Sequence, residues 1–273
     1  MAQRIDLHTH TTASDGVLDP RALVRAARAR GIRVLGITDH DTVAGLGEAI
    51  EEAERVGIEL VPGVELSAED SEGEVHILGY FVDWQQQAFR RFLDWMHKMR
   101  IARAQEMVRR LRELGVPLSW EEVLRQANGA IGRPHVARAL VAAGHVRSWE
   151  EAFCRYLGRG APAYVPSAHL TPEGAVEAIR AAGGIPVLAH PQRTGTPERV
   201  AHLVERGLRG IEVYYPDHTP GDVRRFLELA RRYGLVATGG SDYHGPGTSS
   251  KAPLGSQYVP PDSVKRLRAL RET

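Results

Sequence analysis

The chain has almost no cysteine and no long apolar stretch, and each absence excludes a class of protein. Its 273 residues include one cysteine, Cys154, so an internal disulfide and a multi-cysteine zinc site are excluded. No window approaches the roughly 18 uncharged apolar residues that could cross a membrane. Residues 1–4 lack the apolar core of a signal peptide. These absences predict a protein of the reducing cytoplasm with no membrane partner.

Net charge is also nearly absent, but the charges are unevenly distributed. The whole chain carries +1, whereas residues 84–165 contain 14 Lys/Arg against 7 Asp/Glu, a net charge of +7. The remainder therefore carries −6 and holds most of the histidines. This division predicts cations bound by the acidic part and an anionic substrate attracted by the basic part. Solvated, arginine-rich helix faces are the alternative explanation.

Short β-like runs alternate with helical segments along most of the chain. Asp19, Thr171, Thr196 and Thr219 each precede a proline, the pattern of an N-cap followed by the first helical residue. Between the helices lie seven predicted strands: residues 3–10, 33–39, 59–66, 74–82, 185–190, 210–215 and 235–241. They predict an α/β fold, either a βα-barrel or a related parallel sheet. The turn signal at residues 69–73 predicts that the chain reverses between the third and fourth strands.

Residues 84–165 interrupt this alternation. Ser119 and Ser148, each followed three residues later by glutamate, predict capping boxes that begin two helices. We therefore predict a small helical domain, residues 84–165, inserted between two parts of the barrel, residues 1–83 and 166–273. Apolar side chains recur in its first helix at a spacing that indicates core packing, not a cofactor site: Phe89, Phe92, Leu93, Met96, Met99, Met107, Val108, Leu111 and Leu114.

The first candidate metal ligands lie in residues 5–16. Ile5 and Leu7 alternate with His8 and His10, so a strand would place both imidazoles on one face, and Asp15 follows on the next loop. Because active sites of βα-barrels lie at the carboxyl ends of the strands, we expect these side chains to converge with others at predicted strand ends. These others are His40, Glu65, His190, Asp242 and His244. His76 lies near the start of its predicted strand and would join the same rim because the chain is predicted to reverse at residues 69–73.

The nine candidate ligands offer nitrogen and oxygen donors and no sulfur. Such donors suit Mn, Zn or Fe, with Mn favoured, and their number predicts two or three divalent ions, because one ion would need only three or four ligands. Two adjacent ions would lower the pKa of a bridging water from about 15.7 towards neutrality, giving a metal-bridging hydroxide as nucleophile. We assign Asp15, His40 and His244 to catalysis within this set.

The motifs around these residues resemble those of the PHP (polymerase and histidinol phosphatase) superfamily. Residues 132–138, Gly-Arg-Pro-His-Val-Ala-Arg, together with the inserted helices, resemble one branch of it, the single-domain phosphoesterases of the TrpH type. The likeness runs almost from end to end. Six motifs carry it: Asp6-Leu7-His8-Thr9-His10, Thr38-Asp39-His40-Asp41, Gly63-Val64-Glu65, Val75-His76-Ile77-Leu78-Gly79, Leu188-Ala189-His190-Pro191 and Gly240-Ser241-Asp242-Tyr243-His244.

The resemblance implies a distorted seven-stranded barrel with a trinuclear metal centre. One ion would be held by His8, His10, Glu65 and Asp242. A second would be held by Asp15, His40 and His244, and a third by Glu65, His76 and His190. Two positions depart from the family pattern: Asp15 stands where some relatives have histidine, and Gln192 stands where relatives often have glycine.

Four further residues are candidates for substrate binding. Arg193 follows the His190-Pro191 motif and could make a bidentate contact with the scissile phosphate, and we count it with the catalytic residues. Arg133 and His135 lie at a predicted helix start, where backbone N–H groups also favour anions, and could hold a second phosphate or protonate a leaving group. His218 could line the mouth of the barrel. The remaining histidines, His97, His145, His169 and His202, are predicted to be structural or exposed.

These residues predict a phosphoesterase acting on nucleotides. The resemblance implies hydrolysis of 3′,5′-nucleoside bisphosphates or 5′-to-3′ exonuclease action on short RNA, without an obligate protein partner. The insert lacks an aromatic run for long single strands, which favours small substrates. Histidinol-phosphate phosphatase and a non-catalytic, metal-stabilised nucleic-acid-binding module are the alternatives. An amidohydrolase would need a metal-bridging lysine, for which Lys98, Lys251 and Lys265 are poorly placed.

Overall fold

The computed structural model describes residues 4–127, 129–167, 170–246, 248 and 252–271. His169 and Lys251 lie outside the described residues. Seven strands are present in the described chain: β1 (Arg4–Asp6), β2 (Ile32–Ile37), β3 (Glu59–Asp70), β4 (Gly73–Tyr80), β5 (Ile185–Leu188), β6 (Gly210–Tyr214) and β7 (Val236–Gly239). The helices of the strand-containing part are α1 (Pro20–Ala29), α2 (Leu46–Val56), α7 (Pro172–Ala181), α8 (Pro197–Arg206), α9 (Pro220–Tyr233) and α10 (Pro261–Arg271).

The strands form one sheet in chain order, β1 to β7. The predicted reversal is confirmed, because β3 pairs antiparallel with β4 from Gly63–Tyr80 to Asp70–Gly73, and β4 pairs antiparallel with β5. The other neighbouring strands are parallel. Beyond β1 and β7 the two edges meet through backbone hydrogen bonds from Leu7 N to Gly239 O (3.3 Å) and from His10 N to Tyr243 O (2.9 Å). The fold is therefore a distorted barrel whose seam has no regular ladder.

The predicted strand at residues 3–10 is shorter in the structure, where β1 ends at Asp6. In the segment from Leu7 to His10, a single isolated bridge between Thr9 and Tyr243 replaces the regular pairing of a strand. Gly240 permits this close approach, because a Cβ atom there would lie 2.4 Å from the Cβ atom of His8. The predicted strand at 235–241 is shortened to β7 in the same way. Both histidines of the first motif therefore lie on irregular backbone at the mouth of the barrel.

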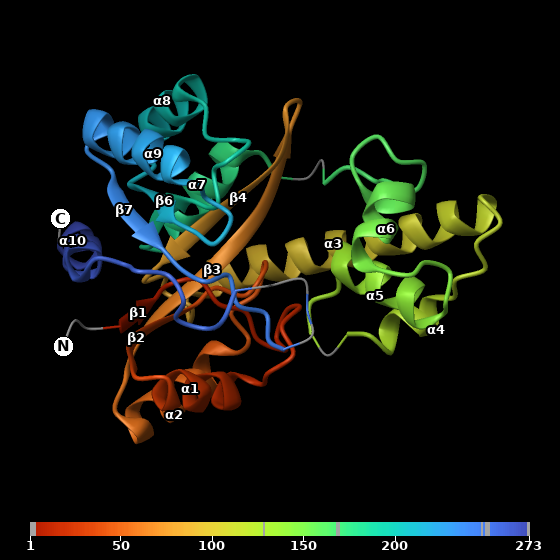
Figure 1. Cartoon of the computed structure of the whole chain (residues 1–273), viewed down its shortest axis with the longest axis horizontal. Coiled ribbons are helices and arrows are strands. Elements are labelled where there is room, and N and C mark those ends of the chain that lie inside the picture. The colour runs from red at the N-terminus through yellow and green to blue at the C-terminus, as the bar shows by residue number, and fades with distance from the viewer. Residues whose placement is uncertain (1–3, 128, 168–169, 247, 249–251, 272–273) are drawn as a thin grey trace.

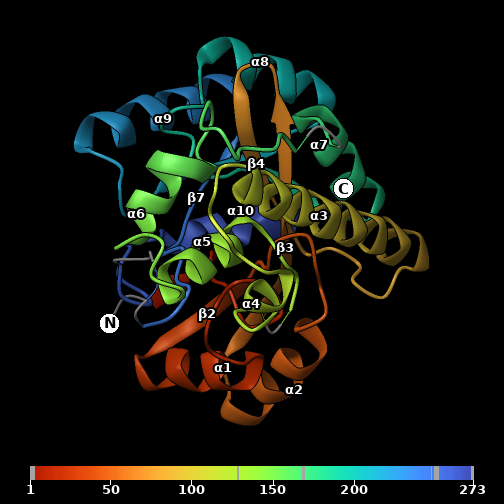
Figure 2. The same cartoon turned by 90° about the vertical axis from the view of Figure 1, so that its right-hand side faces the viewer.

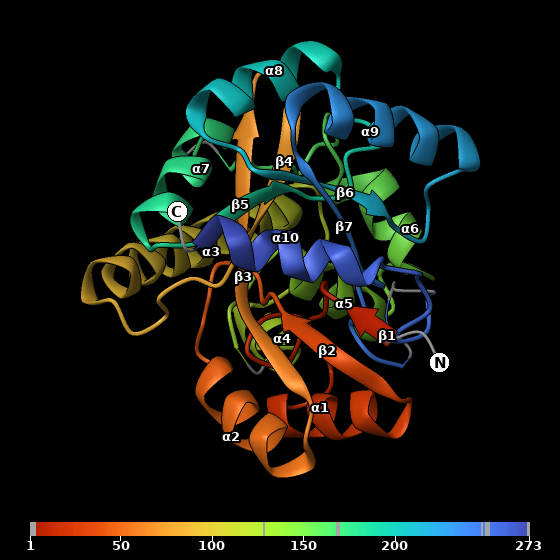
Figure 3. The same cartoon turned by 90° about the vertical axis from the view of Figure 1, so that its left-hand side faces the viewer.

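Two apolar clusters build the barrel. The interior cluster takes inward side chains from most strands, among them Ile5, Val34, Val61 and Val187, and is covered by Leu267 of α10. Helix α10 lies across the strands at the end opposite the insert (Figure 3). A second cluster fills the space between the outer face of the sheet and the surrounding helices. Because burying apolar area is the main driving force of folding, these two layers fix the strand ends that carry the polar residues.

The helix starts confirm the predicted caps. The side chains of Asp19, Thr171, Thr196 and Thr219 accept hydrogen bonds from the backbone N–H group three residues ahead. Ser119 forms the complete predicted capping box with Glu122. The box at Ser148 is incomplete: Ser148 accepts from Glu151 N, but the Glu151 carboxylate accepts from Arg147 N, one residue earlier than predicted.

The insert contains the long helix α3 (Gln87–Glu113), then α4 (Trp120–Leu124), α5 (Arg133–Ala142), α6 (Trp149–Ala152) and one π-helical turn, η1 (Phe153–Leu157). Helix α3 connects the barrel to a lobe formed by α4, α5 and α6 (Figure 1), and Figure 2 shows these helices in front of the strands. No described helix is both long and apolar enough to cross a membrane.

The apolar stripe of α3 belongs to two cores. Phe89, Leu93 and Met96 pack into the core between the sheet and its helices. Met107 and Leu111 pack into a separate core of the insert. Leu114 is 46% exposed, so its inclusion in the stripe was wrong: α3 ends at Glu113 and the chain turns away at Gly115, where φ is +79°. We keep residues 84–165 as the proposed insert, with the first turns of α3 anchored on the barrel.

Candidate metal centre and substrate cavities

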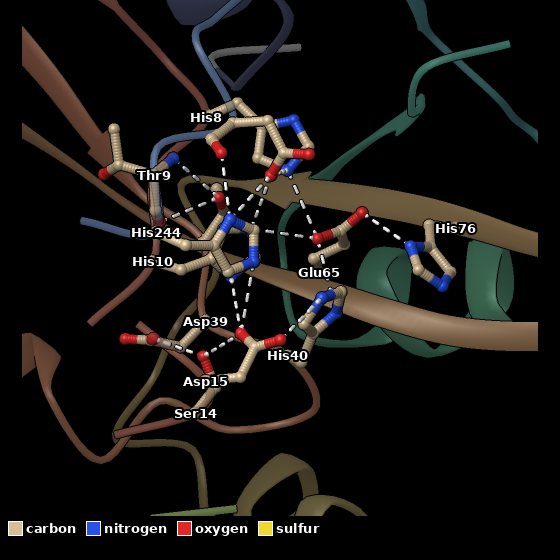
Figure 4. Close-up of polar contacts among 12 residues, drawn as sticks. His8, Thr9, His10, Ser14, Asp15, Asp39, His40, Glu65, His76 and His244 are labelled. Atoms are coloured by element: carbon tan, nitrogen blue, oxygen red, sulfur yellow. Dashed lines mark hydrogen bonds and ion pairs between the residues drawn. The ribbon is translucent and has the colours of Figure 1, made fainter. Parts of the chain in front are cut away.

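The carboxylate of Glu65 lies at the centre of the candidate site. It is 1% exposed, and β3 places it where the chain after β2 makes an isolated bridge between His40 and Glu65. Its Oε1 atom lies 2.9 Å from His76 Nδ1 and 3.0 Å from His190 Nε2. Its Oε2 atom lies 3.2 Å from Nε2 of both His8 and His10, and 3.3 Å from His40 Nδ1. Five imidazoles thus surround one carboxylate, several of them labelled in Figure 4.

The other two carboxylates among the candidate ligands, those of Asp242 and Asp15, also face imidazoles of the cluster. Asp242 Oδ1 lies 3.3 Å from His8 Nε2 and 3.1 Å from His10 Nε2. Asp15 Oδ1 lies 3.2 Å from His244 Nε2 and 3.8 Å from His10 Nδ1, and Figure 4 shows this carboxylate below the rings of His10 and His244. His10 therefore faces both carboxylates.

All nine sequence-predicted ligands lie in this cluster, and their donor atoms form groups of the size that holds a metal ion. One group is His8, His10, Glu65 and Asp242, the same four residues that the resemblance implies. A second is His10, Asp15, His40 and His244, which adds His10 to the implied set. A third is His40, Glu65 and His76. His190 was implied for the third ion and reaches Glu65 Oε1, but it is absent from this group.

The chemistry of the donors fits divalent cations. Both ring nitrogens of His10 and Nδ1 of His40 are buried without a hydrogen-bond partner, although carboxylate oxygens lie within 3.3 Å of two of these three atoms. Short distances without hydrogen-bond alignment are expected where lone pairs point to a common centre and not at each other. Buried polar atoms left unpaired are costly, and a cation would satisfy them.

The electrostatics of the cluster also favour a cation. Burial alone would lower the pKa of His10, but the neighbouring carboxylates of Asp242 and Glu65 raise it to about 10. Burial alone would raise the pKa of the Glu65 carboxyl, whereas His40, His8 and His76 hold it well below its usual range. The same negative potential that attracts protons to the imidazoles attracts divalent ions, which would displace those protons.

The backbone at two of these residues is strained. His190 has φ +26° and Asp242 has φ +50°, a region that residues other than glycine seldom adopt. Backbone strain of this kind concentrates where the surrounding structure holds functional groups in place. Here the hydroxyl of Tyr215 donates to Asp242 Oδ2 (2.9 Å), which leaves Oδ1 facing His8 and His10.

Two of the four predicted substrate-binding residues line cavities at the cluster. Arg193 is exposed and lines a hollow of about 280 Å³ together with His76 and His190. Arg133 lines another hollow, of about 230 Å³, which we call the arginine cavity. Its lining includes Arg100, Arg103 and Arg133 of the insert together with four candidate ligands, Asp15, His40, His76 and His244.

The structure does not bring His135 or His218 into the described cavities. His135 is 1% exposed, and its Nδ1 accepts a hydrogen bond from Gly132 N (3.0 Å). Burial lowers its pKa to about 4, so the ring is neutral and fixes the start of α5. His218 Nδ1 donates a hydrogen bond to Val213 O (2.9 Å), and the ring packs against Phe226.

Three other histidines lie away from the cluster. His202 pairs with Glu173 on the surface, at 3.0 Å. His97 and His145 are half-buried in the insert. Lys98 and Lys265 are exposed, on α3 and α10, so neither bridges the candidate metal groups.

Sequence reasoning missed Glu212, a fully buried carboxylate on β6. Its Oε1 lies 3.0 Å from His8 Nδ1, and its Oε2 accepts from His190 N at 2.8 Å. Because a carboxylate only accepts, His8 Nδ1 donates to Glu212, which leaves Nε2, the nitrogen that faces Glu65 and Asp242, as the atom that would bind an ion. The sequence did hold a signal for Glu212, because it is a charged residue between two apolar ones, Ile211 and Val213, in a predicted strand.

Removing this support should weaken metal binding. We expect Glu212→Ala to lower the affinity of the purified protein for Mn²⁺ by about 10- to 100-fold, the usual effect of losing a carboxylate that orients a histidine ligand. Glu212→Gln keeps one acceptor oxygen for its two partners, His8 Nδ1 and His190 N, so its Mn²⁺ affinity should lie between those of Glu212→Ala and the unaltered protein. Calorimetric titration of metal-free protein measures both. Unchanged affinity in a correctly folded Glu212→Ala variant would show that His8 needs no such support.

Sequence reasoning also missed the contacts that join the insert to the metal cluster. Arg100 of α3 forms an ion pair with buried Asp41, next to His40, and donates to Ser67 Oγ at 3.0 Å. Arg138 of α5 donates to the backbone carbonyl of Asp15. The insert therefore braces two of the segments that carry candidate ligands. No local pattern indicates pairs so distant in sequence.

Comparison with known proteins agrees with this geometry. Residues 6–155 match the model of the PHP domain family, and the chain belongs to that family. It is 40% identical over 249 residues to the 5′-3′ exoribonuclease Rnm of Salmonella typhimurium, covering 88% of this chain and 85% of that protein. It is 36% identical over 267 residues to the 3′,5′-nucleoside bisphosphate phosphatase of Chromobacterium violaceum, covering 94% and 93%.

A crystal structure assigned as a metal-dependent phosphoesterase, from Bifidobacterium adolescentis, has the same fold. It superposes with a TM-score of 0.90 at 35% identity, covering 99% of this chain and 97% of that one. The predicted resemblance to the PHP superfamily and the predicted distorted barrel are thereby confirmed.

Proposed function

We propose that this protein is a metal-dependent phosphoesterase that hydrolyses 3′,5′-nucleoside bisphosphates and short 5′-phosphorylated oligoribonucleotides. The observation that carries the proposal is the arginine cavity, a single hollow lined both by three arginine side chains and by four candidate metal ligands. Relatives named as an exoribonuclease and as a nucleoside bisphosphate phosphatase act on substrates with more than one phosphate, which agrees with such an arrangement.

Two or three divalent ions, with manganese favoured, would be held by the nine residues of the cluster. When bound, such ions lower the pKa of water and offset the charge on phosphate oxygens. Three carboxylates, those of Asp15, Glu65 and Asp242, do not fully neutralise three divalent ions, so the loaded site would keep positive charge for a phosphate. A trinuclear centre, as the resemblance implies, is supported by the three overlapping ligand groups.

The side chains around the cluster would orient the substrate. Arg193, exposed at the rim, would contact the scissile phosphate through a two-pronged hydrogen bond. The side chains of Arg100, Arg103 and Arg133 would hold the second phosphate, which would favour substrates with phosphates at both ends of a nucleoside. Arg103 Nη2 is buried without a hydrogen-bond partner, its neighbouring carboxylate oxygen Glu69 Oε2 lying 4.0 Å away, and a phosphate oxygen would satisfy it.

Phosphate release tests the proposal directly. Purified protein supplied with Mn²⁺ should release phosphate from adenosine 3′,5′-bisphosphate, and chelation should stop the reaction until Mn²⁺ is restored. Faster turnover of histidinol phosphate than of the bisphosphate would favour the histidinol-phosphate phosphatase alternative. No release from any nucleotide would favour a non-catalytic module. A cytoplasmic location remains a prediction from the single cysteine.

Arg133 provides a test of second-phosphate recognition. It pairs with Glu74 and lies over the rings of Phe153 (5.2 Å) and Tyr164 (5.7 Å). We expect Arg133→Met to raise KM for adenosine 3′,5′-bisphosphate by about 10- to 100-fold. A change of this size corresponds to the loss of one or two charge-assisted hydrogen bonds to the second phosphate. The value for adenosine 3′-monophosphate should change by about threefold or less, because this substrate lacks the second phosphate.

The matched control for this prediction is Arg90→Met, an exposed arginine on α3. It removes the same charge from the insert without touching the cavity, so KM for the bisphosphate should stay close to that of the unchanged protein. If Arg133→Met lowers kcat equally on both substrates, Arg133 serves the chemical step and not recognition of a second phosphate.

A further inference from the structure

Two cavities border the metal cluster besides the hollow that Arg193 shares with His76 and His190. One is the arginine cavity, of about 230 Å³. The other is a cavity of about 570 Å³, which we call the Tyr215 cavity, lined by Tyr215, Asp217, Arg193, Asp242 and Ala252. Trp149 and His244 line both cavities, so the two hollows meet directly over the candidate ligands. The larger volume is within the range of about 300–1,000 Å³ that is typical of ligand-binding pockets.

The two cavities differ in charge. The arginine cavity has three guanidinium groups against the single carboxylate of Glu74, apart from the candidate ligand Asp15. The Tyr215 cavity has one arginine, Arg193, and is bordered by the acidic side chains of Glu150 and Asp217. A terminal phosphate is therefore favoured in the first cavity and disfavoured in the second, whereas the ribose hydroxyls and base amino groups of a nucleoside could donate to these carboxylates.

The aromatic side chains of the Tyr215 cavity suit a nucleobase. Tyr215 and Trp149 are both partly exposed at its wall. Their positions are fixed by neighbours: the Tyr215 hydroxyl is bonded to Asp242, and the Trp149 ring lies 4.9 Å from that of Phe153 in the π-helical turn. Stacking on such held rings contributes about 1–3 kcal/mol per base without selecting a sequence.

A terminal phosphate has one organic substituent and a phosphodiester has two. A site that removed only terminal phosphates would need one substrate compartment beside the cluster, yet two compartments of different charge border this one. Resting on the proposed function, we infer that the Tyr215 cavity binds the nucleotide that follows the scissile phosphate, while the first nucleotide and its 5′-phosphate occupy the arginine cavity.

The reaction that this arrangement implies is an ordinary hydrolysis. The oxygen of water forms a bond to the bridging phosphorus, and the bond between phosphorus and the 3′-oxygen of the first nucleotide breaks. One proton of the water ends on that 3′-oxygen, and the other is released to solvent. The phosphate stays on the 5′-oxygen of the next nucleotide, in the Tyr215 cavity, and no further co-reactant is needed.

Filling the cavity tests the inference. Ala252 lies at its wall and belongs to none of the candidate ligand groups, so Ala252→Trp should occupy the space without removing a polar contact. We expect kcat/KM for a 5′-phosphorylated diadenylate to fall about 10- to 100-fold, the equivalent of losing one stacked base. The value for adenosine 3′,5′-bisphosphate should change by about twofold or less. The matched control is Ala143→Trp, an exposed alanine beside a separate hollow of about 130 Å³.

A second variant and binding measurements distinguish an obstructed cavity from a misfolded protein and from a slower chemical step. Asp217→Trp obstructs the same cavity from another side and should give the same selective loss. A diadenylate with a methylene group in place of the bridging 3′-oxygen should bind either obstructed variant more weakly by a similar factor, with unchanged affinity for adenosine 5′-monophosphate.

The outcomes separate the inference from the function on which it rests. Equal losses on the dinucleotide and the bisphosphate would place the first nucleoside in the Tyr215 cavity and overturn the inference, with the proposed function intact. Unchanged dinucleotide cleavage in both obstructed variants would also overturn it. If the unaltered protein hydrolyses neither substrate, the proposed function itself has failed.

Discussion

Replacing Glu65 by glutamine should lower kcat/KM for adenosine 3′,5′-bisphosphate by about 10³-fold or more and reduce bound metal to about one ion per chain. Among the residues that the structure describes, Glu65 is the one carboxylate that reaches five imidazoles, through both of its oxygens. The change keeps the shape of the side chain but removes the negative charge that two ligand groups share. Losing several kcal/mol of charge stabilisation corresponds to a rate loss of this size.

The control for this experiment is Glu54→Gln, an exposed glutamate on α2 far from the cluster. Its activity and metal content should match those of the unaltered protein. Metal analysis by mass spectrometry after gel filtration gives the ion count, and phosphate release gives the rate. A Glu65→Gln protein that retains its full metal content and turnover would contradict the central position given to this carboxylate.

Replacing Asp15 by asparagine should remove one ion and leave the others. Asp15 belongs to one ligand group only, with His10, His40 and His244, whereas Glu65 joins the other two. We therefore expect the metal content to fall by about one ion per chain and kcat to fall by about 10²- to 10³-fold, because one source of charge stabilisation is lost while the rest remains. The two variants together distinguish a shared ligand from a local one.

Asp15→His is the informative companion variant, because histidine is expected at this position in some PHP proteins. It restores a donor where asparagine offers only a weak amide oxygen. We expect it to recover the lost ion, with a changed preference among Mn²⁺, Zn²⁺ and Fe²⁺. If Asp15→Asn loses all metal, the ligand groups do not bind separately. If it keeps all metal, Asp15 is not a ligand.

Much of the site could be predicted because the ligands occur where the strands end. The alternation at residues 5–10 and the ligand-type residues after the apolar runs indicated one rim, and the turn at residues 69–73 explained how His76, near the start of β4, could join it. The nine predicted side chains do lie together. Their roles as ligands and their division among ions remain predictions.

The residues that sequence reasoning missed act through partners far away in the chain. Glu212 meets His8 across 204 positions, and Arg100 meets Asp41 across 59, so neither contact has a local signature. His135 illustrates the opposite difficulty. Its position at a helix start suggested anion binding, but which way the ring faces depends on the packing of α5, and the structure turns it towards Gly132.

The most direct test of the metal centre is anomalous X-ray scattering from crystals grown with Mn²⁺. Strong peaks are expected inside the ring formed by His10, Glu65, Asp242 and Asp15, two or three per chain, with none of comparable height elsewhere. Crystals whose anomalous maps are empty at this position, while the protein still hydrolyses nucleotides in the presence of a chelator, would contradict the account.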